Sequence, residues 1–311
     1  MTTQEGASVQ ERFQAALESF LARVQEDRRV LAAILFGSLS YDEVWEQSDV
    51  DILLIAQDDA QSKSYVLCED GLFFHVHLLP RREFRKEIEG SLQSGFIHSS
   101  LARSRLLFTR DESIREYYEQ TRALGDRDRE LQRMRWATWL LPTFIKAEKW
   151  YVVKRDYAYA YKWLLEVLDG LAALEVLDHG EVTSRENLQR ACELSPELFR
   201  PLYLELMDQP KNAKTVGAAL DRVRTYLLNR AGELFRPLFD YLKEEGTPRT
   251  ATEIAERFER VAQNREIVIA CEWLAYHGFL VAASQPTRLT PKSRTTVEEA
   301  AFYYDEWREL P

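Results

Sequence analysis

The N-terminal third of the chain combines one helical pattern with several short apolar runs. From Val9 to Gln25 apolar residues recur three and four positions apart, which is the spacing of an amphipathic helix. The runs that follow have lengths typical of β-strands. They are Val30–Phe36, Val50–Ala56, Tyr65–Cys68, Leu72–Leu79 and Arg105–Thr109. With a helix at Arg81–Leu92 and a tight hairpin turn at Glu69-Asp70-Gly71, they predict a mixed α/β domain.

The middle of the chain changes to a helical pattern. Long amphipathic segments, punctuated by proline and glycine, predict five helices. These are Asp128–Val153, Tyr157–Leu177, Ser184–Cys192, Glu197–Met207 and Lys211–Leu234. Because the links between them are short, we predict an antiparallel helical bundle.

The last part of the chain predicts a winged-helix-like unit. Thr250–Arg260 and Asn264–Leu280 read as two helices joined by a short link, and short extended pieces, polar turns and a final helix follow. Helices followed by a β-hairpin give the winged-helix order. We therefore expect an α+β protein with three domains, at residues 1–112, 113–234 and 235–311.

The composition is that of an ordinary folded protein. Hydrophobic residues make up 45% and charged residues 30% of the 311 positions. The net charge of −10 gives the whole chain no general attraction for nucleic acid. Three widely spaced cysteines lack disulfide-framework or zinc spacing. There is no signal-peptide pattern and no run of roughly 18 apolar residues, so we expect a cytoplasmic protein without a membrane anchor. The oligomeric state stays open.

The segment ILFGSLSYDEVWEQSDVDILLI carries the most specific chemistry. Asp49 and Asp51 should point to one face of a strand, because strand side chains alternate with period two. Neighbouring carboxylates repel each other unless a cation lies between them, and Mg²⁺ prefers such oxygen ligands. Gly37 permits close backbone approach, and Ser38 can donate to phosphate oxygens. Gly-Ser alone would be an ordinary turn, but this combination predicts a metal–polyphosphate site.

Residues 30–110 resemble the nucleotidyltransferase domain of the DNA polymerase β superfamily, whose signature is Gly-Ser, a loop and Asp-X-Asp. The stretches LARSRLLFTRDESI and YAYAYKWLLEVLDGLAALEVLDHG and the C-terminal tail resemble a bacterial nucleotidyltransferase-like family, the YgxA type. The resemblance implies transfer of a nucleoside monophosphate from an NTP, ATP or GTP, to an acceptor, with release of pyrophosphate. It implies Mg²⁺ on Asp49 and Asp51, and the β/γ-phosphates on Gly37 and Ser38. The acceptor stays open: a small molecule, a tRNA end or a protein side chain.

The chain departs from this family at one position. Active members usually bear a third carboxylate on the next central strand, and in LFFHVHLLPRREF that position falls on His75 or His77. An imidazole could accept a proton from the attacking group or bind a transition metal, but it is a poorer Mg²⁺ ligand. Two alternatives follow: both histidines only fill a half-buried strand face, or the protein binds nucleotides with reduced catalysis. Asp70, in the predicted turn, is an outside candidate.

The segment Phe144–Trp163 is a second candidate for nucleotide contact. In related enzymes a helical bundle closes the nucleotide cleft. Lys146, Lys149, Lys154 and Lys162 could reach phosphates, and Tyr157 or Tyr161 could stack on a base or sugar. The alternative is a solvated lysine face with an aromatic core behind it.

The winged-helix-like end has the wrong charge for DNA. Residues 235–311 contain ten Lys and Arg against 13 Asp and Glu, although Arg288, Lys292 and Arg294 form a small basic group. Because such modules bind DNA by neutralising phosphates, we do not expect specific DNA binding. We expect docking within the chain or with a protein partner, and a regulatory role through this end is the weaker alternative.

Overall fold

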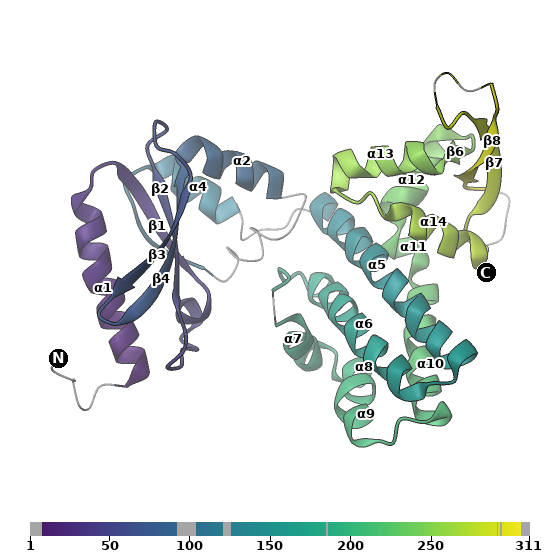
Figure 1. Ribbon diagram of the computed structural model, residues 1–311, viewed down its shortest axis with the longest axis horizontal. Helices are drawn as coiled ribbons and strands as arrows, with labels where there is room; N and C mark the ends of the chain where they lie inside the picture. The colour runs from purple at the N-terminus through teal and green to yellow at the C-terminus, as the bar shows by residue number, and fades with distance from the viewer. Residues whose placement is uncertain are drawn as a thin grey trace. The chain divides into compact units, whose positions relative to one another are not determined.

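The computed structural model describes residues 8–91, 104–120, 126–184, 186–290, 292 and 294–305. The chain divides into two compact units, Met1–Leu124 and Gly125–Pro311 (Figure 1). Among the described helices, none is long and apolar enough to cross a membrane. The α+β class expected from the sequence is confirmed, with a mixed sheet in the first unit and a largely helical second unit.

The first unit is built on a five-stranded sheet in the order β3-β4-β2-β1-β5. Its strands are β1 (Val30–Phe36), β2 (Val50–Ala56), β3 (Lys63–Glu69), β4 (Leu72–Pro80) and β5 (Arg105–Thr109). β2 and β4 run parallel, whereas the other three neighbouring pairs are antiparallel. Glu69 pairs with Leu72, so Asp70 and Gly71 form a two-residue turn, both with positive φ. The predicted hairpin turn is therefore confirmed.

Both faces of this sheet are covered by helices (Figure 1). α1 (Val9–Glu26) packs on one face, where Phe20 meets Phe74 with ring centroids 5.0 Å apart. α2 (Arg81–Ser91) and α4 (Glu112–Gln120) supply Phe84 and Ile114 to the other face. Strand alternation separates the two sets of side chains: Ile52 faces α1, whereas its neighbour Leu53 faces α2 and α4. Asp51 therefore shares the face of Leu53.

The second unit begins with long helices. They are α5 (Asp126–Lys149), the π-helical turn η2 (Trp150–Lys154), α6 (Tyr157–Asp178), α7 (Asn187–Leu194), α8 (Pro196–Phe199), the π-helical turn η3 (Arg200–Leu204), α9 (Glu205–Asp208), α10 (Ala213–Asn229) and α11 (Ala231–Leu234). The helix predicted at Lys211–Leu234 is two helices, because Arg230 leaves helical geometry at φ −111° and ψ 5°. The helix predicted at Glu197–Met207 is three short pieces around Pro201, which cannot donate a helical hydrogen bond.

The remainder of the unit adds three helices and a small sheet. These are α12 (Arg236–Glu245), β6 (Arg249–Thr250), α13 (Ala251–Ala262), α14 (Ile267–Tyr276), β7 (Val281–Thr287) and β8 (Val297–Tyr303), with the strand order β6-β8-β7. Val297–Tyr303 pairs with β7 as a strand, so the expected β-hairpin is present. The final helix was predicted without bounds; residues 304 and 305 after β8 are not helical, and residues 306–311 lie outside the described residues. One buried cluster runs from α5 to β8, and Leu234 and Phe235 are both fully buried in it. The domain boundary at 234/235 therefore stays a sequence-based prediction inside one compact unit.

Candidate metal centre

A sharp turn after β1 forms one side of the site. Gly37 has φ +74° and ψ −167°, a backbone conformation essentially restricted to glycine. The short helix η1 (Ser38–Tyr41) starts directly after it, and Ser40 donates from its backbone N–H and its hydroxyl to the Gly37 carbonyl, at 3.0 and 2.7 Å. A Cβ built on Gly37 would lie 2.4 Å from Oδ2 of Asp51. The missing side chain therefore makes room for the Asp51 carboxylate.

Strand pairing brings the polar side chains to this turn. Asp49 immediately precedes β2, and Asp51 is the second residue of the strand. Asp51 pairs with Phe36 on the antiparallel strand β1 and with His75 on the parallel strand β4. Because paired residues point to the same face of a sheet, Asp51 and His75 stand side by side next to Gly37.

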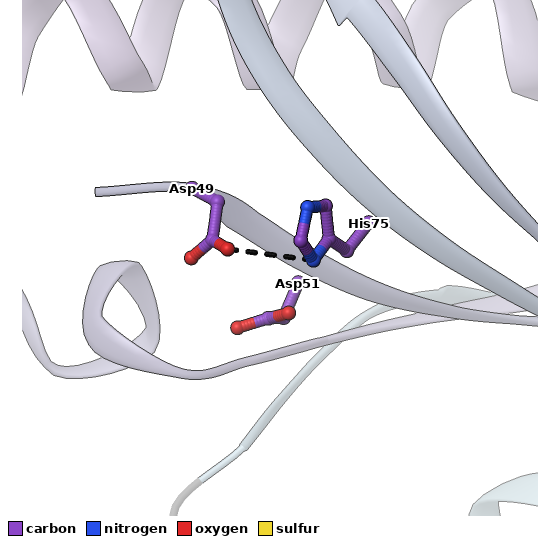
Figure 2. A group of neighbouring side chains, drawn as sticks. All are labelled: Asp49, Asp51 and His75. Carbon is purple, nitrogen blue, oxygen red and sulfur yellow. Dashed lines mark ion pairs between the residues drawn. The ribbon is translucent and has the colours of Figure 1, made fainter. Parts of the chain in front are cut away.

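Asp49, Asp51 and His75 form one cluster, with their side chains turned toward one another (Figure 2). Oδ2 of Asp49 lies 3.4 Å from Nδ1 of His75, and one ligand atom from each residue lies within 4.8 Å of the others. The Asp49 and His75 side chains are 45% and 43% exposed, so an ion and a ligand can reach them from solvent.

This donor set fits a divalent cation. Ligand atoms on one ion are separated by up to roughly 4–5 Å, about twice a metal–ligand bond, and the cluster is close to that size before any adjustment. Two carboxylates neutralise the charge of the ion, and the imidazole adds a nitrogen ligand. The absence of a Cβ at Gly37 allows the Asp51 carboxylate to lie close to the turn.

The structure separates the two candidate histidines. His75 belongs to the cluster, whereas His77 lies two residues further along β4, opposite Leu53. Nδ1 of His77 is 2.9 Å from the Ser64 hydroxyl, and its ring stacks 6.4 Å from that of Phe36. His77 and Asp70 are therefore outside the group that the described residues form. Ser38 opens η1 next to Gly37, and its carbonyl accepts a bond from the Glu43 N–H at 3.0 Å.

The candidates for nucleotide contact from the helical region lie in the second unit. Lys146 and Lys149 occupy the last turn of α5, and Lys154 lies in η2. The ammonium of Lys146 stands 4.2 Å from the centre of the Trp163 ring. Tyr161 is half-buried against the core of this unit, and this burial raises the pKa of its phenol. Contact of any of these residues with a nucleotide stays a prediction.

One positioning residue escaped the sequence reasoning. Arg105, at the start of β5, donates from Nη2 to the carbonyl of Leu39 at 3.3 Å and so ties η1 to the sheet. The sequence alone does not show this contact. It depends on the pairing of β5 with β1, which brings Arg105 opposite Leu35.

Comparisons with known proteins agree with this geometry. Residues 19–113 match the family model described as "Polymerase beta, Nucleotidyltransferase". The matched residues include Gly37, Asp49, Asp51 and His75, so the candidate site lies inside the part of the chain that resembles a polymerase β nucleotidyltransferase domain. The crystal structure of a nucleotidyltransferase-like protein from Exiguobacterium sibiricum 255-15 is similar over 94% of this chain and 99% of that chain. The two share 17% sequence identity with a TM-score of 0.63, which is a likeness of fold. A search of the curated proteins found no match.

Proposed function

We propose that the protein is a nucleotidyltransferase that needs a divalent cation, with Mg²⁺ as the metal implied by the resemblance, and that its substrate is ATP or GTP. The observation that carries the proposal is the cluster of Asp49, Asp51 and His75 beside the Gly37 turn, inside a domain that matches nucleotidyltransferases. The acceptor is a small molecule, an RNA end or a protein side chain.

The proposed reaction is an in-line substitution at the α-phosphorus. An acceptor hydroxyl or amine forms a bond to the α-phosphorus, the bond to the bridging oxygen of the β-phosphate breaks, and pyrophosphate leaves with that electron pair. The acceptor loses its proton to solvent or to an imidazole. A bound divalent cation supplies neutralisation of the phosphate charge. Asp49 and Asp51 hold the cation, and Ser38 with nearby backbone amides orients the outgoing phosphates along the turn.

The remaining parts of the chain receive supporting roles in this proposal. The succession of α12, β6, α13, α14, β7 and β8 supports a winged-helix end of the YgxA type. α14 carries Glu272 and no Lys or Arg, which argues for docking to protein and against reading of DNA.

A double substitution tests the proposed chemistry. Asp49→Asn with Asp51→Asn removes both anionic ligands at nearly constant volume, so we expect transfer of labelled nucleotide to fall by at least about a thousandfold. The assay incubates the protein with each labelled NTP and a cell lysate and follows the label. Asp70→Asn, in the type of turn that accepts asparagine, is the matched control and should keep full activity. Undiminished transfer by the double variant would remove the mechanism.

A second function is favoured by one observation, the imidazole in place of a third carboxylate. In this alternative the domain binds nucleotide and metal but has reduced or lost catalysis. Calorimetry separates the two functions: binding of ATP or GTP with a divalent cation, without release of pyrophosphate in the presence of lysate, would favour the binding protein.

A further inference from the structure

We propose that His75 gives this centre a preference for a transition-metal ion, such as Mn²⁺, over Mg²⁺. The inference rests on the metal site of the proposed function, but it does not require that transfer occurs. It follows from the donor atoms that the fold brings together: two carboxylates and one imidazole nitrogen.

The pairing of β2 with β4 fixes the imidazole at the carboxylates. Asp51 and His75 are paired residues on parallel strands, and Nδ1 of His75 approaches Oδ2 of Asp49 to 3.4 Å. The neighbouring histidine on the same strand face is held elsewhere, since Nδ1 of His77 meets the Ser64 hydroxyl at 2.9 Å. Sheet geometry therefore selects one nitrogen ligand for the site.

Mg²⁺ and Mn²⁺ differ in the ligands that they accept at such a site. Mg²⁺ is a hard cation that is bound through carboxylates, phosphates and water, and it gains little from imidazole. Mn²⁺ accepts carboxylate and water as readily, and it also takes imidazole as a ligand. Zn²⁺ binds nitrogen more strongly but is usually four-coordinate, which leaves about one position for other ligands beside three protein ligands. The half-exposed cluster leaves positions for phosphate oxygens and water, which suits the octahedral Mn²⁺.

The exchange of one ligand tests the proposal on the full-length protein. Electron paramagnetic resonance measures free Mn²⁺ during titration, and Mg²⁺ is then added as a competitor. His75→Ala should weaken Mn²⁺ binding by at least about tenfold, the scale of losing a ligand or its support. His75→Asp should restore an all-oxygen site and lower the ratio of Mn²⁺ to Mg²⁺ affinity by at least roughly tenfold. His77→Asp is the matched control and should leave this ratio within about twofold.

Three results would overturn the proposal. They are an unchanged affinity ratio in His75→Asp, unchanged Mn²⁺ binding in His75→Ala, and an effect of His77→Asp as large as that of His75→Asp. If a variant fails to fold, a measurement on the wild-type protein still tests the proposal. Electron spin echo modulation of Mn²⁺ bound to the wild-type protein should show one directly bound nitrogen. Absence of that nitrogen coupling would also overturn the proposal.

The outcome is distinguishable from that of the proposed function. Nitrogen-bound Mn²⁺ without nucleotide transfer under any metal would contradict the transferase and keep this inference. Transfer supported by Mg²⁺ as well as by Mn²⁺, with equal affinities for the two ions, would contradict this inference and keep the transferase.

Discussion

At the scale of single residues, Gly37 determines whether Asp51 can take part in the site. Alanine at this position would place a Cβ 2.4 Å from the Asp51 carboxylate in a backbone conformation that disfavours any side chain. We predict that Gly37→Ala lowers Mn²⁺ affinity by at least about tenfold, because Asp51 must turn away. The strained backbone should also cost about 1–3 kcal/mol of unfolding free energy. Metal titration and urea unfolding measure the two effects.

Gly71 provides a matched control for this prediction. It also has a positive φ, +81°, but nothing lies within 4 Å of a Cβ built there. Gly71→Ala should lose stability through backbone strain and keep its metal affinity. If Gly37→Ala kept its affinity as well, the close approach of the turn to Asp51 would have no role in the site.

Residues of the site differ in how far the sequence could predict them. Asp49 and Asp51 were found because alternation along one strand is a local property. The choice between His75 and His77 needed a second strand, since both point to the same face and only the pairing of Asp51 with His75 distinguishes them. Arg105 was missed for the same reason, because its contact with Leu39 depends on β5 lying beside β1.

At the scale of elements, α10 and the turn η2 are fitted closely together at Gly217. A Cβ at this position would lie 2.4 Å from the hydroxyl oxygen of Tyr151, which donates to the carbonyl of Ala213 at 3.0 Å. We predict that Gly217→Ala destabilises the protein by about 1–3 kcal/mol, the usual cost of overpacking. Tyr151→Phe removes the clashing oxygen, so the double variant should be more stable than additivity predicts. Urea unfolding of all four proteins gives the coupling energy.

Gly232 is the control for helix propensity. It lies in α11, and nothing occupies the space around a Cβ built on it. Gly232→Ala should therefore stabilise the protein by about 0.5–1 kcal/mol.

Additive effects of the Gly217→Ala and Tyr151→Phe changes would mean that α10 and η2 adjust to each other without strain.

Elements were predictable where local pattern and tertiary pairing agree. β1 and β2 have the predicted bounds, because apolar strands buried on both faces read as continuous runs, and the edge strand β5 also has the predicted bounds. The end of α5 was not predictable: the helix passes into the π-helical turn η2, where Tyr151 packs beside Gly217. The bounds of β8 were not predictable, because its Glu and Ala residues favour a helix locally, whereas pairing with β7 makes it a strand.

At the scale of the whole molecule, the two units have separate hydrophobic cores. The buried clusters of the first unit extend up to Tyr118, and the cluster of the second starts at Met134. The proposed metal ligands all belong to the first unit. We therefore predict two unfolding transitions in calorimetry. A bound ion should raise the midpoint temperature of only one of them. At about 100 times its Kd, Mn²⁺ should stabilise the first unit by about 2.7 kcal/mol.

The positions of the tryptophans allow the unfolding of the second unit to be measured separately. Six of the seven tryptophans lie after residue 125, and Trp45 is the exception. Intrinsic fluorescence therefore follows the unfolding of the second unit, and this midpoint should not move with Mn²⁺ while one calorimetric transition moves upward. Asp51→Asn should abolish the upward shift without changing the fluorescence midpoint. A joint shift of both signals would mean that the units unfold as one cooperative body, because metal bound in the first unit would then stabilise the second.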